Sequence, residues 1–142
     1  MNTIRLVAVF AENKPGQTAK VTRVLADAGI NIRWATIASS GSFGVLKFVV
    51  DNCDLACQRL RDKGLMVSTL RALAVQAPDR PGALSAVAET LAAHQINLDN
   101  TSGFVVNNQA ILIIETHDLE RAAAALEQKG WRLLSETELL GA

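Results

Sequence analysis

The sequence predicts an α+β protein made of two tandem units, each with the element order β-α-β-β-α-β. Three observations lead to this prediction. The chain repeats itself at a fixed shift, each repeat alternates strand-like with helix-like segments, and the composition is that of a folded chain. Of the 142 residues, 49% are hydrophobic and 20% are charged, which is typical of a globular protein and unlike a disordered one.

The internal repeat appears when the chain is aligned with itself at a shift of 66 residues. Between positions 3 and 65, 17 of the 63 aligned pairs are identical and no gap is needed. A composition this rich in Ala and Leu would give roughly 5 identities by chance. Identical pairs include Pro15-Gly16 with Pro81-Gly82, and Ile30-Asn31 with Ile96-Asn97. We therefore predict a duplicated domain, with one copy over residues 1–69 and the other over residues 70–142.

The first half of each copy should contain a strand followed by a helix. In the first copy, Ile4 to Phe10 is an apolar, strand-like run that ends at the breaker Asn13-Lys14-Pro15-Gly16. Pro15 suits the first helical position, where its missing N–H costs nothing. Gly29 should end the helix, because glycine readily adopts positive φ. The apolar face of this helix is expected to contain Val21, Val24, Leu25 and Ala28.

A hairpin should follow this helix. Asn31 to Ala38 alternates in the manner of a strand, and Phe43 to Val50 is a second apolar run. The turn Ser39-Ser40-Gly41-Ser42 separates them. These two segments should therefore pair in an antiparallel ladder.

The second half of each copy should contain a helix and a last strand. Asp54 is expected to cap this helix in the first copy and Asp118 in the second, and both helices should end in Lys-Gly. A last strand should begin near Met66 or Trp131. Met66 to Ala77 contains neither glycine nor proline, so the last strand of the first copy should continue into the first strand of the second with hardly any linker.

This order of elements is the split β-α-β pattern of ferredoxin-like domains, in which two helices cover one face of a four-stranded antiparallel sheet. A domain of this size buries little surface alone, and its open sheet face and edge strands favour association. We therefore expect the two units to pack side by side as one rigid body. We also expect the protein to form a homodimer.

The charge balance and the N-terminus exclude several classes of function. Basic and acidic residues number 14 each, and aromatic residues make up only 4% with no Tyr, so no nucleic-acid partner is expected. The apolar run from Leu6 to Ala11 meets Glu12 too early for a signal-peptide core. No stretch approaches the roughly 20 apolar residues of a membrane helix. We expect a cytoplasmic protein without membrane contact.

The residues that most often carry catalysis or bind metals do not form a recognisable set. Cys53 and Cys57 lie four residues apart on a predicted helix and could form half of a metal site. His94 and His117 are far away in sequence, so we interpret both cysteines as reduced, partly buried thiols. No nucleophile has a recognisable base beside it, and no G-x-x-x-x-G-K-[ST] loop is present. We expect no cofactor, no metal and no enzymatic activity.

The loop and the strand that flank the first helix resemble the signature of the ACT domain. In the first copy the two segments are Asn13-Lys14-Pro15-Gly16 and Gly29-Ile30-Asn31-Ile32. In the second copy they are Asp79-Arg80-Pro81-Gly82 and Gln95-Ile96-Asn97-Leu98. The resemblance covers nearly the whole chain in two tandem units. It implies a non-catalytic sensor of a small molecule, usually an amino acid, that is associated with a metabolic enzyme or a transcription regulator.

The resemblance also implies that ligands bind where two ACT units meet, between the first loop of one and the start of the second strand of the other. The free N–H groups of a helix start suit a carboxylate, and Gly16 permits close approach to the backbone. The Asn31 amide offers donors and an acceptor to a zwitterion. The candidate ligand-binding residues are Asn13, Lys14, Gly16, Gln17, Asn31 and Ile32, with Asp79, Gly82, Ala83, Asn97 and Leu98 as a second set.

A structural role for the same residues stays open. Asn13 and Asp79 could cap helices, the Pro-Gly pairs could simply turn the chain, and Asn31 and Asn97 could bond the neighbouring backbone. We interpret the two tryptophans, Trp34 and Trp131, as packing residues.

The two copies differ where a ligand would lie. Gln17 and Thr18 stand where the second copy has Ala83 and Leu84, so the first copy should present a polar pocket and the second should serve as scaffold. We therefore expect one asymmetric amino-acid sensor. The alternative is a ligand-free interaction or oligomerisation subunit of an amino-acid metabolic enzyme, for which the strand edges would suffice.

Overall fold

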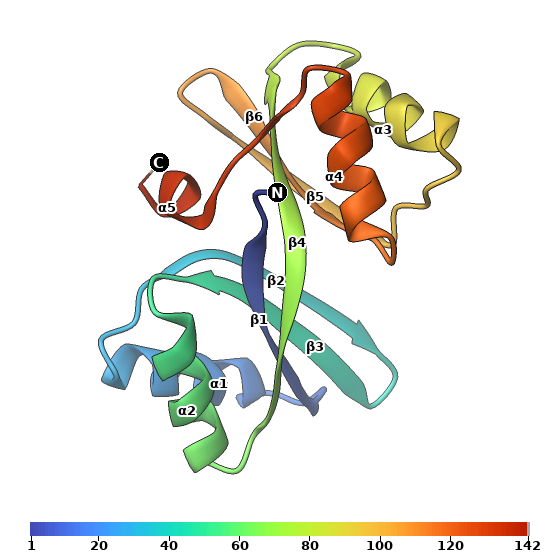
Figure 1. The fold of residues 1–142 in the computed structure, drawn as a ribbon. Coiled ribbons are helices and arrows are strands. Elements are labelled where there is room, and N and C mark those ends of the chain that lie inside the picture. Colours follow the sequence, from blue (N-terminus) through green and yellow to red (C-terminus); the bar gives the residue numbers. More distant parts are fainter. Residues whose placement is uncertain (142) are drawn as a thin grey trace. The chain divides into compact units, whose positions relative to one another are not determined.

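The computed structural model describes residues 1–141, and the chain divides into two compact units (Figure 1). The first unit is Arg5–Leu70, and the second combines Met1–Ile4 with the chain from Arg71 onward. Both units contain helices and antiparallel strands, so the predicted α+β class is confirmed.

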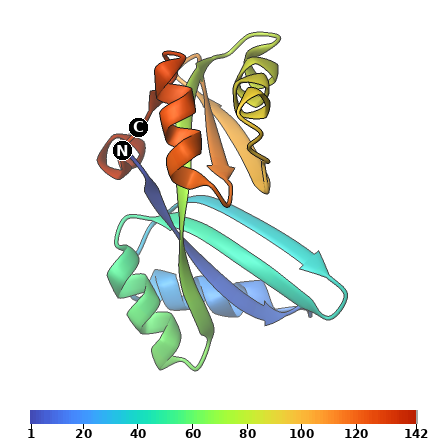
Figure 2. The same cartoon turned by 45° about the vertical axis from the view of Figure 1, so that its right-hand side comes forward.

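The first unit takes its elements from the first copy of the repeat. They are β1 (Ile4–Glu12), α1 (Gln17–Asp27), β2 (Ile32–Ser40), β3 (Phe43–Val50), α2 (Cys53–Asp62) and the beginning of β4 (Met66–Pro78). Strand β3 lies between β1 and β2 and is antiparallel to both. Helices α1 and α2 lie on one face of these strands (Figures 1 and 2).

The core of the first unit lies between these strands and helices, because alternate residues of each strand face the helices. Val7 of β1 and Phe48 of β3 lie opposite one another in the ladder and are almost fully buried. They belong to one apolar cluster with Val21 and Leu25 of α1 and with Leu60 of α2. The predicted apolar face of the first helix is therefore the face that packs on the sheet.

The start of α2 differs from the prediction. Its cap is Asn52, whose side-chain oxygen accepts a hydrogen bond from the N–H of Leu55 at 3.2 Å. The predicted cap, Asp54, lies inside the first helical turn and forms an ion pair with Arg5 at 3.1 Å. The helix begins at Cys53, one residue before Asp54, so Asn52 occupies the cap position and the prediction for Asp54 was wrong.

The hairpin between β2 and β3 is tighter than predicted. Ser39 and Ser40 continue β2 and pair with Gly44 and Phe43, so the turn contains only Gly41 and Ser42. Two-residue turns match the twist of the strands that they connect, and they allow the ladder to extend to the turn itself.

The second unit repeats this arrangement and adds a helix. It contains the rest of β4, α3 (Ala83–Ala93), β5 (Asn100–Val106), β6 (Gln109–Glu115), α4 (Leu119–Gln128), β7 (Arg132–Leu133) and α5 (Glu136–Leu140). Strand β6 lies between β4 and β5, and β7 pairs with the other edge of β4. An apolar cluster that includes Leu73, Leu91, Ile114 and Leu126 fills the space between these strands and the two long helices.

Strand β4 carries the chain from one unit into the next. It is a single strand of 13 residues, and the boundary between the units falls inside it, after Leu70. The absence of glycine and proline from Met66 to Ala77 is what allows this continuous strand, because every residue there can adopt extended backbone. As predicted, no linker separates the two copies.

The capping of α4 agrees with the prediction in position but not in chemistry. Asp118 is the N-cap residue, yet its side chain makes no capping hydrogen bond. Its carboxylate instead accepts a hydrogen bond from the guanidinium of Arg121, one turn later in the same helix. This ion pair keeps the carboxylate near the positive end of the helix dipole.

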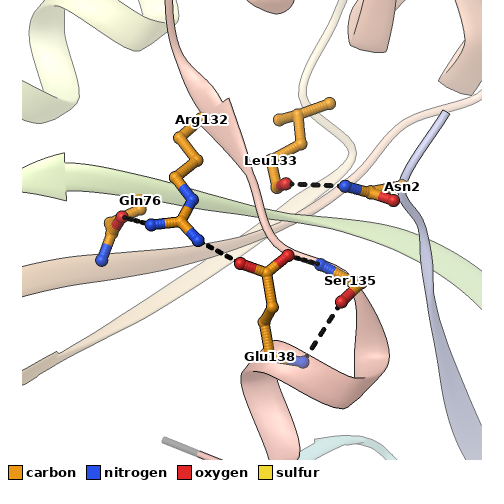
Figure 3. Close-up of polar contacts among 6 residues, drawn as sticks. All are labelled: Asn2, Gln76, Arg132, Leu133, Ser135 and Glu138. Atoms are coloured by element: carbon orange, nitrogen blue, oxygen red, sulfur yellow. Dashed lines mark hydrogen bonds and ion pairs between the residues drawn. The ribbon is translucent and has the colours of Figure 1, made fainter.

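Helix α5 has no counterpart in the first copy and lies outside the sequence predictions. A capping box starts it: the Ser135 hydroxyl accepts from the N–H of Glu138, and the Glu138 carboxylate accepts from the N–H of Ser135, each at 3.2 Å (Figure 3). The backbone hydrogen bond from Ser135 and the guanidinium of Arg132 lower the pKa of Glu138. Ser-x-x-Glu at positions 135–138 is the sequence signal that indicates this helix.

A buried hydroxyl on β5 leads to a stability prediction. Thr101 lies opposite Ile114 and faces the second core, and its Oγ1 has no hydrogen-bond partner among the described residues. An unsatisfied buried polar group costs about 1–3 kcal/mol. We expect the near-isosteric Thr101→Val substitution to raise the free energy of unfolding by about 1 kcal/mol, measured by urea denaturation.

The same substitution at Thr90 is the matched control. Its hydroxyl is also buried but donates to the Ala86 carbonyl at 2.9 Å, so Thr90→Val should bring no gain. A loss of stability in Thr101→Val would contradict the assignment of Thr101 as an unsatisfied group.

Candidate ligand-binding site

The first loop of the first copy forms a tight turn before α1. The N–H of Gln17 donates to the Lys14 carbonyl at 3.3 Å, and Gly16 has a φ of 85°. Pro15 therefore occupies a turn position before the helix, and its predicted place at the first helical position was wrong. The combination of Pro and Gly at the centre of the turn explains this, because Pro fixes the negative φ of one turn residue and Gly supplies the positive φ of the next.

This turn leaves the start of α1 without a side-chain cap. Gly16 is the N-cap residue and provides no capping group, and the first helical hydrogen bond runs from the N–H of Lys20 to its carbonyl at 3.0 Å. The intervening N–H groups of Thr18 and Ala19 have no acceptor within the helix. The second copy repeats this geometry at Gly82, whose φ is 90°.

Asn13 connects the first loop to the hairpin. Its side-chain amide donates to the Gly41 carbonyl at 3.1 Å, and its N–H donates to the Ser42 carbonyl at 2.8 Å. The interpretation of Asn13 as a helix cap was wrong, since α1 has no side-chain cap. Lys14 beside it forms an exposed ion pair with Glu12 at 3.4 Å.

Asn31 stands at the start of β2 and is held there by Asp51. The Asn31 N–H donates to the Asp51 carboxylate at 3.2 Å, and the Asn31 carbonyl accepts from the Asp51 N–H at 3.3 Å. These bonds involve only the Asn31 backbone, so its side-chain amide is left exposed. Together with Ile32, it lines a hollow of about 470 Å³.

The other walls of this hollow come largely from α1. Two alanines leave the space open, and Thr22 and Arg23 supply polar groups. The guanidinium of Arg23 pairs with Asp27 at 3.5 Å, and its side chain is 73% exposed, so this ion pair holds it only weakly. The lining residues are Ala19, Thr22, Arg23, Ala26, Ile30, Asn31 and Ile32.

Within one unit, the two groups of predicted site residues do not meet. Asn13, Lys14, Gly16 and Gln17 lie before α1, whereas Asn31 lies beyond its far end. A helix of 11 residues is roughly 16 Å long at 1.5 Å per residue. The hollow accordingly includes Asn31 and Ile32 but none of the loop residues.

Sequence reasoning missed the α1 wall. Ala19, Thr22, Arg23 and Ala26 follow an i, i+3, i+4, i+7 spacing, which places them on one face of a helix. This stripe contains small and polar residues, unlike the apolar stripe of the same helix, so apolar periodicity does not reveal it. A lone arginine among small residues is the signal that could have found it.

The equivalent region of the second copy has the opposite charge. The residues that align with Thr22 and Arg23 are Ala88 and Glu89. The Asn97 amide donates to Asp99 at 3.3 Å, so this amide is already occupied. Leu98 is half-buried and packs against the second core. Of the remaining candidates, Asp79 is exposed in the loop after β4, and Ala83 is the first residue of α3.

Comparison with known proteins identifies the family. Residues 2–141 match the family described as an ACT domain pair. The chain belongs to this family. The ACT resemblance that the two loop signatures indicated is therefore confirmed, and it extends over both copies. Membership in a family of regulatory domains supports a regulatory role for this ACT pair.

Solved structures share the fold of this ACT pair. The protein BT0572 from Bacteroides thetaiotaomicron has a TM-score of 0.92 at 30% identity, over 96% of this chain and 95% of that chain. The regulatory subunit of aspartate kinase from Thermus thermophilus, in its ligand-free form, has a TM-score of 0.61 at 19% identity, over 89% and 91%. The corresponding subunit from Thermus flavus has 0.59 at 16%, over 90% and 92%. No curated protein matches this chain in sequence.

The two cysteines of the first ACT unit are buried in α2 and are not bonded to each other. Burial, with Cys57 as a close neighbour, raises the pKa of Cys53 from its ordinary value near 9 to about 11. Among residues 1–141, no three His, Cys, Asp or Glu side chains gather as a metal site. In the same part of the chain, no helix is both long and apolar enough to cross a membrane.

The burial of both cysteines, together with the raised pKa of Cys53, predicts unreactive thiols. At pH 7.5 the Cys53 thiolate is scarce, so iodoacetamide should label neither cysteine in the folded protein and both after unfolding in urea, as measured by mass spectrometry. The unfolded chain loses the thiol proton near pH 9, before the folded chain does. The contribution of Cys53 to stability is therefore complete below pH 9 and is lost as the pH rises to about 11. Rapid labelling of the folded protein would contradict this.

Proposed function

We propose that this ACT pair is a non-catalytic regulatory protein that binds a free amino acid and thereby modulates a metabolic enzyme or a transcription regulator. The observation that carries the proposal is the hollow of about 470 Å³ between α1 and the start of β2. Its volume lies within the roughly 300–1,000 Å³ of small-molecule sites.

The residues of the hollow suit both ends of an amino acid. The guanidinium of Arg23 offers two parallel donors to an α-carboxylate. The Asn31 amide oxygen accepts from an α-ammonium, and Ile32 provides apolar surface for a side chain. The second copy has Glu89 in place of Arg23, which favours one site of this kind per chain.

The predicted loop residues would contact the ligand only if a second ACT unit contributes them. In one unit, the uncapped start of α1 and the Asn31 side chain are separated by the length of the helix. A ligand that contacts both must therefore lie between two ACT units, with Asn13, Lys14, Gly16 and Gln17 from one and Asn31 and Ile32 from another. Asp79, Gly82, Ala83, Asn97 and Leu98 would form the weaker second set. Binding at such an interface would shift the assembly of a homodimer.

The finer features of the fold belong to the same proposal. We further propose domain boundaries at residues 1–69 and 70–142, four-stranded sheets packed side by side, and a location in the cytoplasm.

Thermal unfolding with each of the twenty amino acids tests the proposed function. A ligand present at 100 times its dissociation constant stabilises the folded state by about 2.7 kcal/mol. We expect at least one amino acid to raise the melting temperature, and we expect Asn31→Ala to abolish the part of this rise that comes from binding in the hollow, because the hollow loses its amide. The apo protein should melt almost unchanged, since the structural bonds of Asn31 involve only its backbone.

Asn97→Ala in the second copy is the matched control and should leave most of the ligand-induced rise intact, because the Asn97 amide is already bonded to Asp99. If no amino acid moves the melting temperature, the alternative gains: a ligand-free interaction or oligomerisation subunit of an amino-acid metabolic enzyme. Phe10 and Phe43 favour that alternative, because these aromatic side chains are 41% and 64% exposed.

A further inference from the structure

A second hollow lies in the second unit, against the helix pair. It has a volume of about 340 Å³, and its walls are α3 on one side and the residues that follow α4 on the other. Its lining residues are Ala86, Glu89, Thr90, Ala93, Lys129 and Trp131. None of them lines the hollow beside Asn31, and none belongs to the predicted loop or strand sites.

The repeat shows what is unusual about this place. Thr90 and Trp131 align with Val24 and Leu65 of the first copy. Those two aliphatic side chains pack against the first core, and Val24 also lines a hollow of about 350 Å³ in the first unit, together with Lys63. The second copy has replaced them by a hydroxyl and an indole, so a packing position has gained polar groups.

The indole is fixed in orientation. Its N–H donates to the Thr90 hydroxyl at 3.4 Å, and that hydroxyl in turn donates to the Ala86 carbonyl at 2.9 Å. Thr90 is only 7% exposed, and Trp131 packs against the second core. The part of the indole that is not packed lines the hollow, as an apolar wall with one hydrogen bond to Thr90. Trp131 is therefore a packing residue, as predicted, and a lining residue as well.

The charges of the hollow are balanced. Glu89 supplies one carboxylate, which accepts a hydrogen bond from Ser85 at 3.4 Å, and Lys129 supplies one ammonium. Lys129 makes no ion pair within the described part of the chain, so its ammonium is available to a ligand. One anion and one cation suit a molecule that carries both charges, whereas an anionic nucleotide would lie against Glu89.

We propose that this hollow is a second binding site, for a small zwitterion with an aliphatic side chain such as leucine. Lys129 binds its carboxylate, Glu89 binds its ammonium, and the aliphatic part lies against Trp131 in the space that Ala86 and Ala93 leave open. The volume is at the lower end of small-molecule sites, which suits a ligand the size of one amino acid. This site goes beyond the proposed function, because none of its residues lines the hollow beside Asn31, which we call the first hollow.

The fluorescence of Trp131 tests this site directly. Trp34→Phe leaves Trp131 as the only tryptophan of the chain. We expect leucine to change the Trp131 emission in a saturable manner below 10 mM. Leucinamide lacks the carboxylate and 4-methylpentanoate lacks the ammonium, so each should bind at least about tenfold more weakly. The absence of a saturable change with leucine would overturn the proposal, and so would equal binding of the three compounds.

Variants in the same single-tryptophan background locate the site. Lys129→Ala should weaken leucine binding at least about tenfold, and Lys63→Ala, the aligned lysine of the first copy, should not. Calorimetric titration of Trp131→Leu, which restores the residue type of the first copy, should show the same loss. The Trp131 response should survive Asn31→Ala, which separates failure of this site from failure of the proposed function. A response that disappears in Asn31→Ala or persists in Lys129→Ala would overturn the assignment.

Discussion

Replacement of Phe48 by alanine should lower the free energy of unfolding by about 3–5 kcal/mol, because it removes the largest fully buried side chain and leaves a cavity between the sheet and the helices. Phe48 is 1% exposed and lies on the central strand of the first unit, opposite Val7 on one side and Ala35 on the other. Neither neighbour can move into the space without breaking its own ladder. Urea denaturation followed by circular dichroism measures the loss.

Phe43→Ala provides the control, since it makes the same change on the same strand. Phe43 is 64% exposed, so its loss should cost well under 1 kcal/mol. Equal destabilisation by the two substitutions would show that Phe48 does not occupy the core that its burial indicates.

The order of elements could be predicted because the sequence contains it in two copies. A strand, a breaker, a helix and a hairpin at the same shift of 66 residues are difficult to misread, and the apolar positions Val21 and Leu25 do face the core. The ACT signature of Pro-Gly and Ile-Asn also repeats at that shift. The residues that repeat are those that form the helices, strands and turns, so sequence reasoning identified these elements.

The errors concern residues whose roles depend on distant partners. Asp54 appeared to be a helix cap, but Arg5 of β1 binds its carboxylate. Asn13 had the chemistry of a cap, but the turn of the hairpin accepts its amide protons. The local sequence is compatible with a capping role and with a distant partner for such a residue, and only the tertiary fold selects one of these roles. Helix α5 was missed for a different reason, since it occurs once and the repeat draws attention to what occurs twice.

The candidate site was predicted only in part for a similar reason. Asn31 and Ile32 belong to the signature and line the larger hollow, but Thr22 and Arg23 differ between the copies and therefore stood outside the shared pattern. The chemistry of the second hollow also depends on divergence, because its indole and hydroxyl replace aliphatic side chains of the first copy. Functional differences between duplicated domains are expected at positions where the repeat fails.

Arg23→Glu should weaken amino-acid binding at the first hollow at least about 100-fold. A hydrogen bond to a charged group contributes about 1.5–3 kcal/mol, and the substitution replaces this attraction for the ligand carboxylate by repulsion. Arg23 is exposed and its pair with Asp27 is long, so the fold should be unaffected. Calorimetric titration with the amino acid that stabilises the wild-type protein measures the dissociation constant.

Arg59→Glu separates a local contact from a general effect of charge. Arg59 is exposed on α2 of the same unit and does not line the first hollow, and its substitution changes the net charge by the same amount. Binding should be reduced by less than about threefold in this variant, because Arg59 does not line the hollow and an exposed charge that makes no direct contact is strongly screened by water and salt. If both variants lose affinity equally, the ligand is attracted by the charge of the unit and does not contact Arg23. If neither variant loses affinity, the ligand carboxylate does not bind at Arg23. The uncapped start of α1 at Gly16 is then the stronger candidate for binding this carboxylate, because two N–H groups there can donate to an anion.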